Sequence, residues 1–113
     1  MRLDLNLPER KVGFDIGYDP DFASDVNMRI CIDKLGAPEP EVVHAMSRCL
    51  REGDHAIDVG ANVGFFTLLM SQIVGKTGKV TAFEPAPNNL RKLYENLGAN
   101  EISSQIEVHL QLS

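Results

Sequence analysis

Two acidic residues each close a short apolar segment, and a glycine-bearing loop follows the first of them. Asp58 lies at the end of the segment HAIDV, and Gly60 and Gly64 follow at a spacing that suits a tight turn leading into a helix. Glu84 closes the next apolar segment, KVTAFE. Ligands of open parallel sheets bind beyond the carboxyl ends of the strands. We therefore expect both carboxylates and the free amides of residues 60–64 to face one ligand.

The residue types favour a positively charged cofactor over a dinucleotide. A dinucleotide loop reads GxGxxG, but Asn62 stands where the middle glycine would be. Asp58 would also face the pyrophosphate, a repulsion on the order of a few kcal/mol in a partly desolvated site. S-adenosyl-L-methionine has no phosphate: Asp58 can pair with its ammonium, and the loop amides can bind its carboxylate. Glu84 can accept from ribose hydroxyls, a need that NAD shares. Pro85 offers adenine an apolar surface.

Alternating strands and helices must position these residues. Apolar residues at helical spacing predict helices from Pro40, over 63–74 and from Pro87. HAIDV, KVTAFE and IEVHLQLS read as strands, the last with one wet face. The first two do not alternate, which predicts helices on both faces of the sheet. The order is a βαβαβ unit, half of a doubly wound parallel sheet. The predicted helix faces are Val42, Val43, Met46, Cys49 and Leu50; Val63, Phe66, Met70, Ile73 and Val74; and Leu90, Leu93, Tyr94 and Leu97.

The N-terminal third is read as a separate segment. Residues 1–37 are predicted to precede a domain over residues 38–113. Within them KVGFDI and NMRICI read as short strands, and the turn formers of GYDPDFASDV lie between. This pattern favours a β-hairpin or a strap over the sheet edge.

Composition excludes several classes of function. The 113 residues carry a net charge of −5 with no run of five like charges, which argues against nucleic acid or anionic lipid as a partner. No apolar stretch is long enough to span a bilayer, and the N-terminus lacks the apolar core of a signal peptide. Cys31 and Cys49 have no metal-ligand spacing, and the histidines are unclustered. We expect reduced, buried thiols, no metal site and a cytoplasmic location.

The stretch from Ile57 to Asn100 resembles the FkbM family of S-adenosylmethionine-dependent methyltransferases. In that family a loop D-x-G-A-N-x-G-x-x-S/T is followed by a strand ending in F-E-P. The resemblance covers about residues 38–112 and implies a Rossmann-like class I methyltransferase sheet, truncated after its third strand in this chain. The matching residues are Asp58, Gly60, Ala61, Asn62, Gly64, Thr67, Phe83, Glu84 and Pro85.

The resemblance also implies a function and a site. Family members mostly methylate hydroxyls of sugars, glycans and polyketide-type products, so a small-molecule or glycan acceptor is expected. Residues 86–113 offer no candidate general base, and the chain alone is expected to be inactive. A non-catalytic module with a methyltransferase-like core and an NAD-dependent oxidoreductase fragment are the alternatives. The first strand would be an exposed edge, which favours a homo-oligomer. The expected cofactor-binding residues are Asp58, Gly60, Ala61, Asn62, Gly64, Glu84, Pro85 and Phe65, the last also a core candidate.

Overall fold

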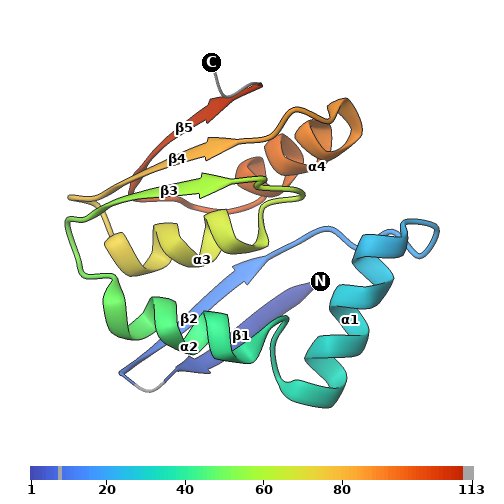
Figure 1. The fold of residues 1–113 in the computed structure, drawn as a ribbon, viewed down its shortest axis with the longest axis horizontal. Helices are drawn as coiled ribbons and strands as arrows, with labels where there is room; N and C mark the ends of the chain where they lie inside the picture. Colours follow the sequence, from blue (N-terminus) through green and yellow to red (C-terminus); the bar gives the residue numbers. More distant parts are fainter. Residues whose placement is uncertain (8, 111–113) are drawn as a thin grey trace.

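Three parallel strands form the sheet that carries both acidic residues (Figure 1). In the computed structural model, which describes residues 1–7 and 9–110, β3 (His55–Val59), β4 (Lys79–Phe83) and β5 (Gln105–His109) pair in the order β3-β4-β5. Both pairs are parallel, with His55 opposite Lys79 and Lys79 opposite Gln105. The predicted βαβαβ unit is confirmed. The last predicted strand ends at His109, and its expected residues Gln111, Leu112 and Ser113 lie outside the described residues.

The three predicted helices are confirmed, and all three pack on the same face of this sheet. They are α2 (Pro40–Cys49), α3 (Phe65–Val74) and α4 (Pro87–Gly98), and α2 and α4 begin with proline. Helix α3 covers Ala56 and Val80, with α2 beside it, and α4 covers Ala82. Helices on both faces were expected, and for the described residues this is wrong. On the other face Ile57 and Val59 are 61% and 62% exposed.

The N-terminal third holds a hairpin and a helix. Strands β1 (Arg2–Leu7) and β2 (Arg10–Asp15) pair antiparallel. The predicted strand KVGFDI is therefore confirmed, and its partner is RLDLNL, whose leucines alternate with polar residues. NMRICI as a strand is wrong, because it belongs to helix α1 (Ala23–Leu35). Met28 of that stretch is buried while Ile30 is 44% exposed, so the apolar alternation does not correspond to one buried face.

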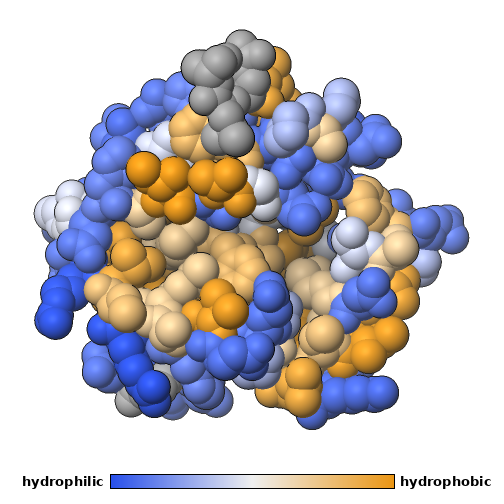
Figure 2. Space-filling view, viewed as in Figure 1, coloured by the Kyte–Doolittle hydropathy of each residue, from blue (hydrophilic) through white to orange (hydrophobic). Residues whose placement is uncertain are grey.

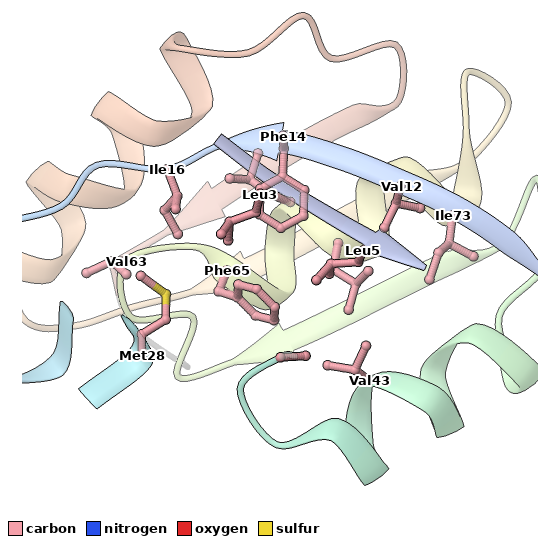
Figure 3. Close-up of a cluster of buried hydrophobic side chains, with 13 residues drawn as sticks. Leu3, Leu5, Val12, Phe14, Ile16, Met28, Val43, Val63, Phe65 and Ile73 are labelled. Carbon is pink, nitrogen blue, oxygen red and sulfur yellow. The ribbon is translucent and has the colours of Figure 1, made fainter. Parts of the chain in front are cut away.

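The core lies between the hairpin and α3, so that α3 is covered on two sides (Figures 1 and 3). Leucines of β1 and Val12, Phe14 and Ile16 point toward α3, and the ring of Phe14 meets Phe65 edge-on at 5.6 Å. The sheet covers the opposite side of the helix. This double cover explains why α3 is apolar almost all round. Its buried residues are Phe65, Thr67, Leu68, Leu69, Met70, Ser71, Ile73 and Val74.

Three residues of the predicted helix faces are more exposed than expected. Tyr94 of α4 is 54% exposed, and the buried position beside Leu93 is instead held by Asn96. In α2, Val42 and Cys49 are exposed, whereas Val43 is fully buried. The expectation of buried thiols is wrong for Cys49, and Cys31 is half-buried; both are free. Within the described ranges, no helix has both the length and the apolar character that a bilayer crossing needs.

Candidate functional site

A cavity of about 540 Å³ lies at the carboxyl end of β3, where the sequence places the ligand. The loop after β3 forms one wall. Helix α1, the segment that joins it to α2, and α2 itself form the opposite wall, which sequence reasoning missed entirely. The lining residues are Ser24, Asn27, Met28, Cys31, Pro38, Glu39, Val42 and Met46 from that wall, and Asp58 to Val63, Phe65 and Phe66 from the loop side.

Asp58 lies in this cavity with one carboxylate oxygen already engaged. Its Oδ2 accepts a hydrogen bond of 2.6 Å from Thr67 Oγ1, and the residue is half-buried. Burial raises the pKa of this carboxyl above its ordinary value; the Thr67 bond lowers it, and the nearby charge of Glu84 raises it further. A positive group entering the cavity would stabilise the ionised form. Asp58 thus lines the cavity at the end of β3, where the sequence predicts it.

Glu84 is brought to the same loop but is turned toward the backbone. Its Oε1 accepts from the Asn62 amide at 2.7 Å and its Oε2 from the Ala86 amide at 2.9 Å. The residue is only 4% exposed and is not part of the cavity wall. Each carboxylate oxygen can accept more than one hydrogen bond, so each keeps capacity for a ligand hydroxyl. In this conformation the hydrogen bonds of Glu84 hold the loop against the end of β4.

The loop amides are engaged within the protein. Gly60 and Ala61 donate to the Phe83 carbonyl at 2.9 and 3.0 Å, and Gly64 donates to the Ala61 carbonyl at 3.0 Å. The Asn62 amide donates to the carboxylate described above. The expectation that the amides of residues 60–64 are free for a ligand is therefore wrong for these four, because the end of β4 and the loop itself accept their hydrogen bonds.

Three loop residues have positive φ, each for its own reason. Gly60 has φ 73°, and a Cβ there would meet no atom within 4 Å. Asn62 has φ 57°, a conformation that asparagine tolerates better than most residues. Gly64 has φ 101°, and a Cβ there would lie 2.7 Å from Leu93 Cδ1. The close approach that Gly64 permits is therefore to α4.

The aromatic and proline candidates divide between core and cavity. Phe65 is buried against Phe14, so its expected core position is confirmed. It also borders the cavity, and its contact with a cofactor stays a prediction. Phe66 was expected in the core; it is half-buried, stacks edge-on against Phe65 at 5.0 Å and borders the cavity as well. Pro85 is exposed beside Glu84.

Helix α1, part of the opposite wall of the cavity, is joined to α4 by a salt bridge. Lys92 Nζ lies 3.5 Å from Asp25 Oδ2 and 3.6 Å from Asp19 Oδ2, and 4.3 Å from the centre of the Phe22 ring. Asp25 is almost fully buried, so this pair fixes the start of α1. The local pattern of residues 19–25 does not predict the contact of Asp25 with Lys92, 67 residues further along the chain.

The charged side chains that line the cavity are acidic. Asp58 and Glu39 both line it, and Glu39 has φ 45° at the start of α2. No lysine, arginine or histidine side chain lines it in the part of the chain that the structure describes. Such a cavity attracts a cationic ligand and opposes a phosphate.

Comparison with known proteins points to one class of enzyme. Residues 58–113 match the family model described as the methyltransferase FkbM domain. A protein-L-isoaspartate O-methyltransferase of Methanococcus maripaludis is 38% identical over 56 residues, which are 47% of this chain and 26% of that protein. Protein-L-isoaspartate O-methyltransferase 2 of Archaeoglobus fulgidus is 31% identical over 71 residues, 60% of this chain and 32% of that protein. The matches thus span only about a quarter to a third of these curated relatives.

The fold is shared with a solved methyltransferase-like structure. A protein of Clostridium thermocellum, described as a candidate rRNA methylase, superimposes with a TM-score of 0.61 at 17% identity. The superposition covers 64% of this chain and 39% of the other. At that identity the likeness concerns the fold, which is that of class I methyltransferases.

Proposed function

We propose, from the FkbM methyltransferase domain that residues 58–113 match, that this chain is the cofactor-binding part of an enzyme that uses S-adenosyl-L-methionine. The observation that carries the proposal is the cavity beside β3, which presents Asp58 and Glu39 and no basic side chain among the described residues. S-adenosylmethionine carries a sulfonium and an ammonium and lacks phosphate. Its charge is complementary to this cavity, whereas a dinucleotide would bring a pyrophosphate to it.

The residues have distinct proposed roles. Asp58 pairs with the ammonium of the cofactor through the oxygen that Thr67 leaves free. Glu84 accepts from the ribose hydroxyls with its remaining lone pairs, while its present bonds keep the loop in place. Because four loop amides are engaged, Ser24 and Asn27 of α1, which line the cavity, are the proposed donors to the cofactor carboxylate.

The proposed reaction is transfer of the sulfonium methyl group to an oxygen. In such a reaction the acceptor oxygen would bond to the methyl carbon as the carbon–sulfur bond breaks, giving S-adenosylhomocysteine, and the hydroxyl proton would pass to a base that is not assigned to any described residue of this chain. Both curated relatives are named O-methyltransferases, which supports an oxygen acceptor. The FkbM resemblance favours a hydroxyl of a sugar, glycan or natural product. Positioning of the acceptor supplies up to about 7–11 kcal/mol in such reactions, and no residue of this chain is assigned to it. The chain alone is therefore expected to bind cofactor without turnover.

Two alternative functions are separable by experiment. An NAD-dependent oxidoreductase fragment is opposed by Asn62 in the loop and by the negative cavity. A non-catalytic module with the same fold would need no cofactor. Isothermal titration calorimetry with S-adenosylhomocysteine, and separately with NAD, tests both. Binding of the first and not the second is the expected result, and binding of neither would overturn the proposal.

A matched pair of variants assigns the affinity to the cavity. Asp58→Asn removes the charge but keeps an oxygen for Thr67, and should weaken S-adenosylhomocysteine binding about 10- to 100-fold, since bonds to charged groups contribute about 1.5–3 kcal/mol. Asp33→Asn removes an exposed charge on α1, which pairs with Arg29 at 3.8 Å, and should leave the affinity unchanged. Equal affinities for wild type and Asp58→Asn would exclude Asp58 from the site.

A further inference from the structure

Thr67 is a buried polar residue that lies next to the site without lining the cavity. It sits in the first turn of α3, is fully buried, and donates from Oγ1 to Asp58 Oδ2 at 2.6 Å. We propose that Thr67 is a positioning residue: it fixes the Asp58 carboxylate so that the second oxygen faces the cofactor ammonium, and it stabilises the charged form of Asp58. This inference rests on the proposed function.

The contact is directed and is not an incidental result of packing. A threonine inside a helix commonly donates to the carbonyl four residues before it. Here the residue four before Thr67 is Val63, which precedes helix α3, and its carbonyl accepts Asn96 Nδ2 at 2.6 Å. The Thr67 hydroxyl turns instead toward the sheet and reaches the end of β3. Because an unpaired buried hydroxyl costs about 1–3 kcal/mol, Thr67 needs Asp58 as its partner as much as Asp58 needs Thr67.

The electrostatic surroundings give the hydroxyl a second task. The titratable groups that share this region are Glu84 at the end of β4, Glu39 at the start of α2 and Cys31 of α1. None of them is a cation at neutral pH. Burial and the charge of Glu84 raise the pKa of Asp58, and the bond from Thr67 acts in the opposite direction. The bond from Thr67 is thus the contact that favours the ionised form of Asp58 against these two effects.

The expected pH dependence follows from these signs. Pairing with an ammonium needs the ionised carboxylate, so affinity falls as the pH drops through the pKa of Asp58 in the free protein. Removing the Thr67 hydroxyl raises that pKa, and the acid limb of the binding profile then moves to higher pH. A merely structural role for Thr67 would change the affinity by the same factor at every pH.

The test uses two variants of the full 113-residue chain. Thr67→Val keeps the shape and removes the hydroxyl, and Thr67→Ser keeps the hydroxyl. The affinity for S-adenosylhomocysteine is measured by calorimetry between pH 4 and pH 8. We expect the Thr67→Val profile to lose affinity at higher pH than wild type, and Thr67→Ser to follow wild type. Superimposed acid limbs for wild type and Thr67→Val overturn the inference.

The outcomes separate this inference from the proposed function. A wild-type chain that binds no S-adenosylhomocysteine at any pH contradicts the proposed function itself. A wild type that binds through Asp58, but with an acid limb that is indifferent to the hydroxyl, contradicts only the role of Thr67. Should Thr67→Val fail to fold, NMR of the wild-type complex decides: a Thr67 hydroxyl proton protected from exchange and close to the Asp58 carboxyl carbon is expected, and its absence overturns the inference.

Discussion

Leu93 of α4 occupies the space that a side chain at Gly64 would need, because a Cβ at Gly64 would lie 2.7 Å from Leu93 Cδ1. Leu93 is fully buried and packs against Ala61 and Ala82. The loop that shapes the cavity is therefore pressed between the sheet and α4. Gly64 is therefore required by the packing of the loop against α4, independently of any ligand.

Gly64→Ala should be much more costly than Gly60→Ala. At Gly64 the unfavourable φ of 101° and the collision with Leu93 add, and we expect a loss of about 2–5 kcal/mol in the free energy of unfolding. At Gly60 only the backbone conformation is unfavourable, and we expect about 1–2 kcal/mol. Urea unfolding of both variants measures the difference. Equal losses would mean that the contact with Leu93 does not constrain the loop.

Asp58→Asn should stabilise the protein at neutral pH while it weakens cofactor binding. Burial raises the pKa of Asp58, so the folded state binds a proton more tightly than the unfolded chain does. The destabilisation from Asp58 therefore sets in as the pH rises from the unfolded pKa, about 3.9, through the folded pKa, and is complete above it. Asparagine avoids it and can still accept from Thr67.

The measurement for Asp58→Asn is urea unfolding at two pH values. The variant should exceed wild type in free energy of unfolding at pH 7, and the advantage should shrink toward the unfolded pKa. Such a gain in stability at the expense of binding is common when a charged site residue is replaced. A variant less stable than wild type at pH 7 would contradict the assigned direction.

Asn96→Ala should loosen both the loop and the connection from β2 to α1. Asn96 Nδ2 donates to the Val63 carbonyl at 2.6 Å, and its Oδ1 accepts from the Gly17 amide at 2.7 Å. Loss of the side chain leaves the buried Val63 carbonyl unpaired and removes the partner of the exposed Gly17 amide, which should cost about 1–3 kcal/mol. Hydrogen exchange of the Gly17 amide should become faster. Asn88→Ala, an exposed asparagine of the same helix, serves as the control and should change stability by less than about 0.5 kcal/mol.

The isolated chain should self-associate through β3. In the described part of the chain β3 is an edge strand, with Ile57 and Val59 exposed. Figure 2 shows hydrophobic surface over β3, and an apolar groove of about 450 Å³ between α2 and β3 continues it to Val42. A second copy can cover both. Sedimentation velocity should give a sedimentation coefficient that rises with concentration.

Two lysine substitutions locate this association. Ile57→Lys should shift the protein toward the monomer, because it places a charge on the exposed strand. Ile30→Lys, at an exposed position of α1 away from β3, should leave the association of the wild type intact. Wild-type protein that is monomeric at every concentration would exclude self-association.

The part of the fold from Pro40 onward could be predicted because its signals are local. The helix starts at Pro40 and Pro87 and the strands that end at Val59 and Phe83 depend on spacing within about ten residues. The alternation of RLDLNL was equally local, and β1 could have been found from it. NMRICI was misread because a few apolar residues fit both a strand and a helix with one exposed isoleucine.

The cavity could be predicted only on its loop side. Its opposite wall depends on contacts such as Lys92 with Asp25, which no spacing rule connects. The direction of Glu84 depends on its hydrogen-bond donors, and the amides of Asn62 and Ala86 supply these. The residue types therefore predicted which groups gather at the site, while their hydrogen-bond partners had to come from the structure.

Helix α3, enclosed between the sheet and the hairpin, has Gln72 as its one fully exposed residue. Because this helix is buried on nearly all sides, its register is fixed by its neighbours. Inserting a single residue would rotate every later side chain by about 100° and place it against different neighbours. During divergence this segment should vary at position 72 alone, or else change in step with the strands that enclose it. An aligned set of related chains would then show α3 and the N-terminal hairpin exchanging residues as compensating pairs.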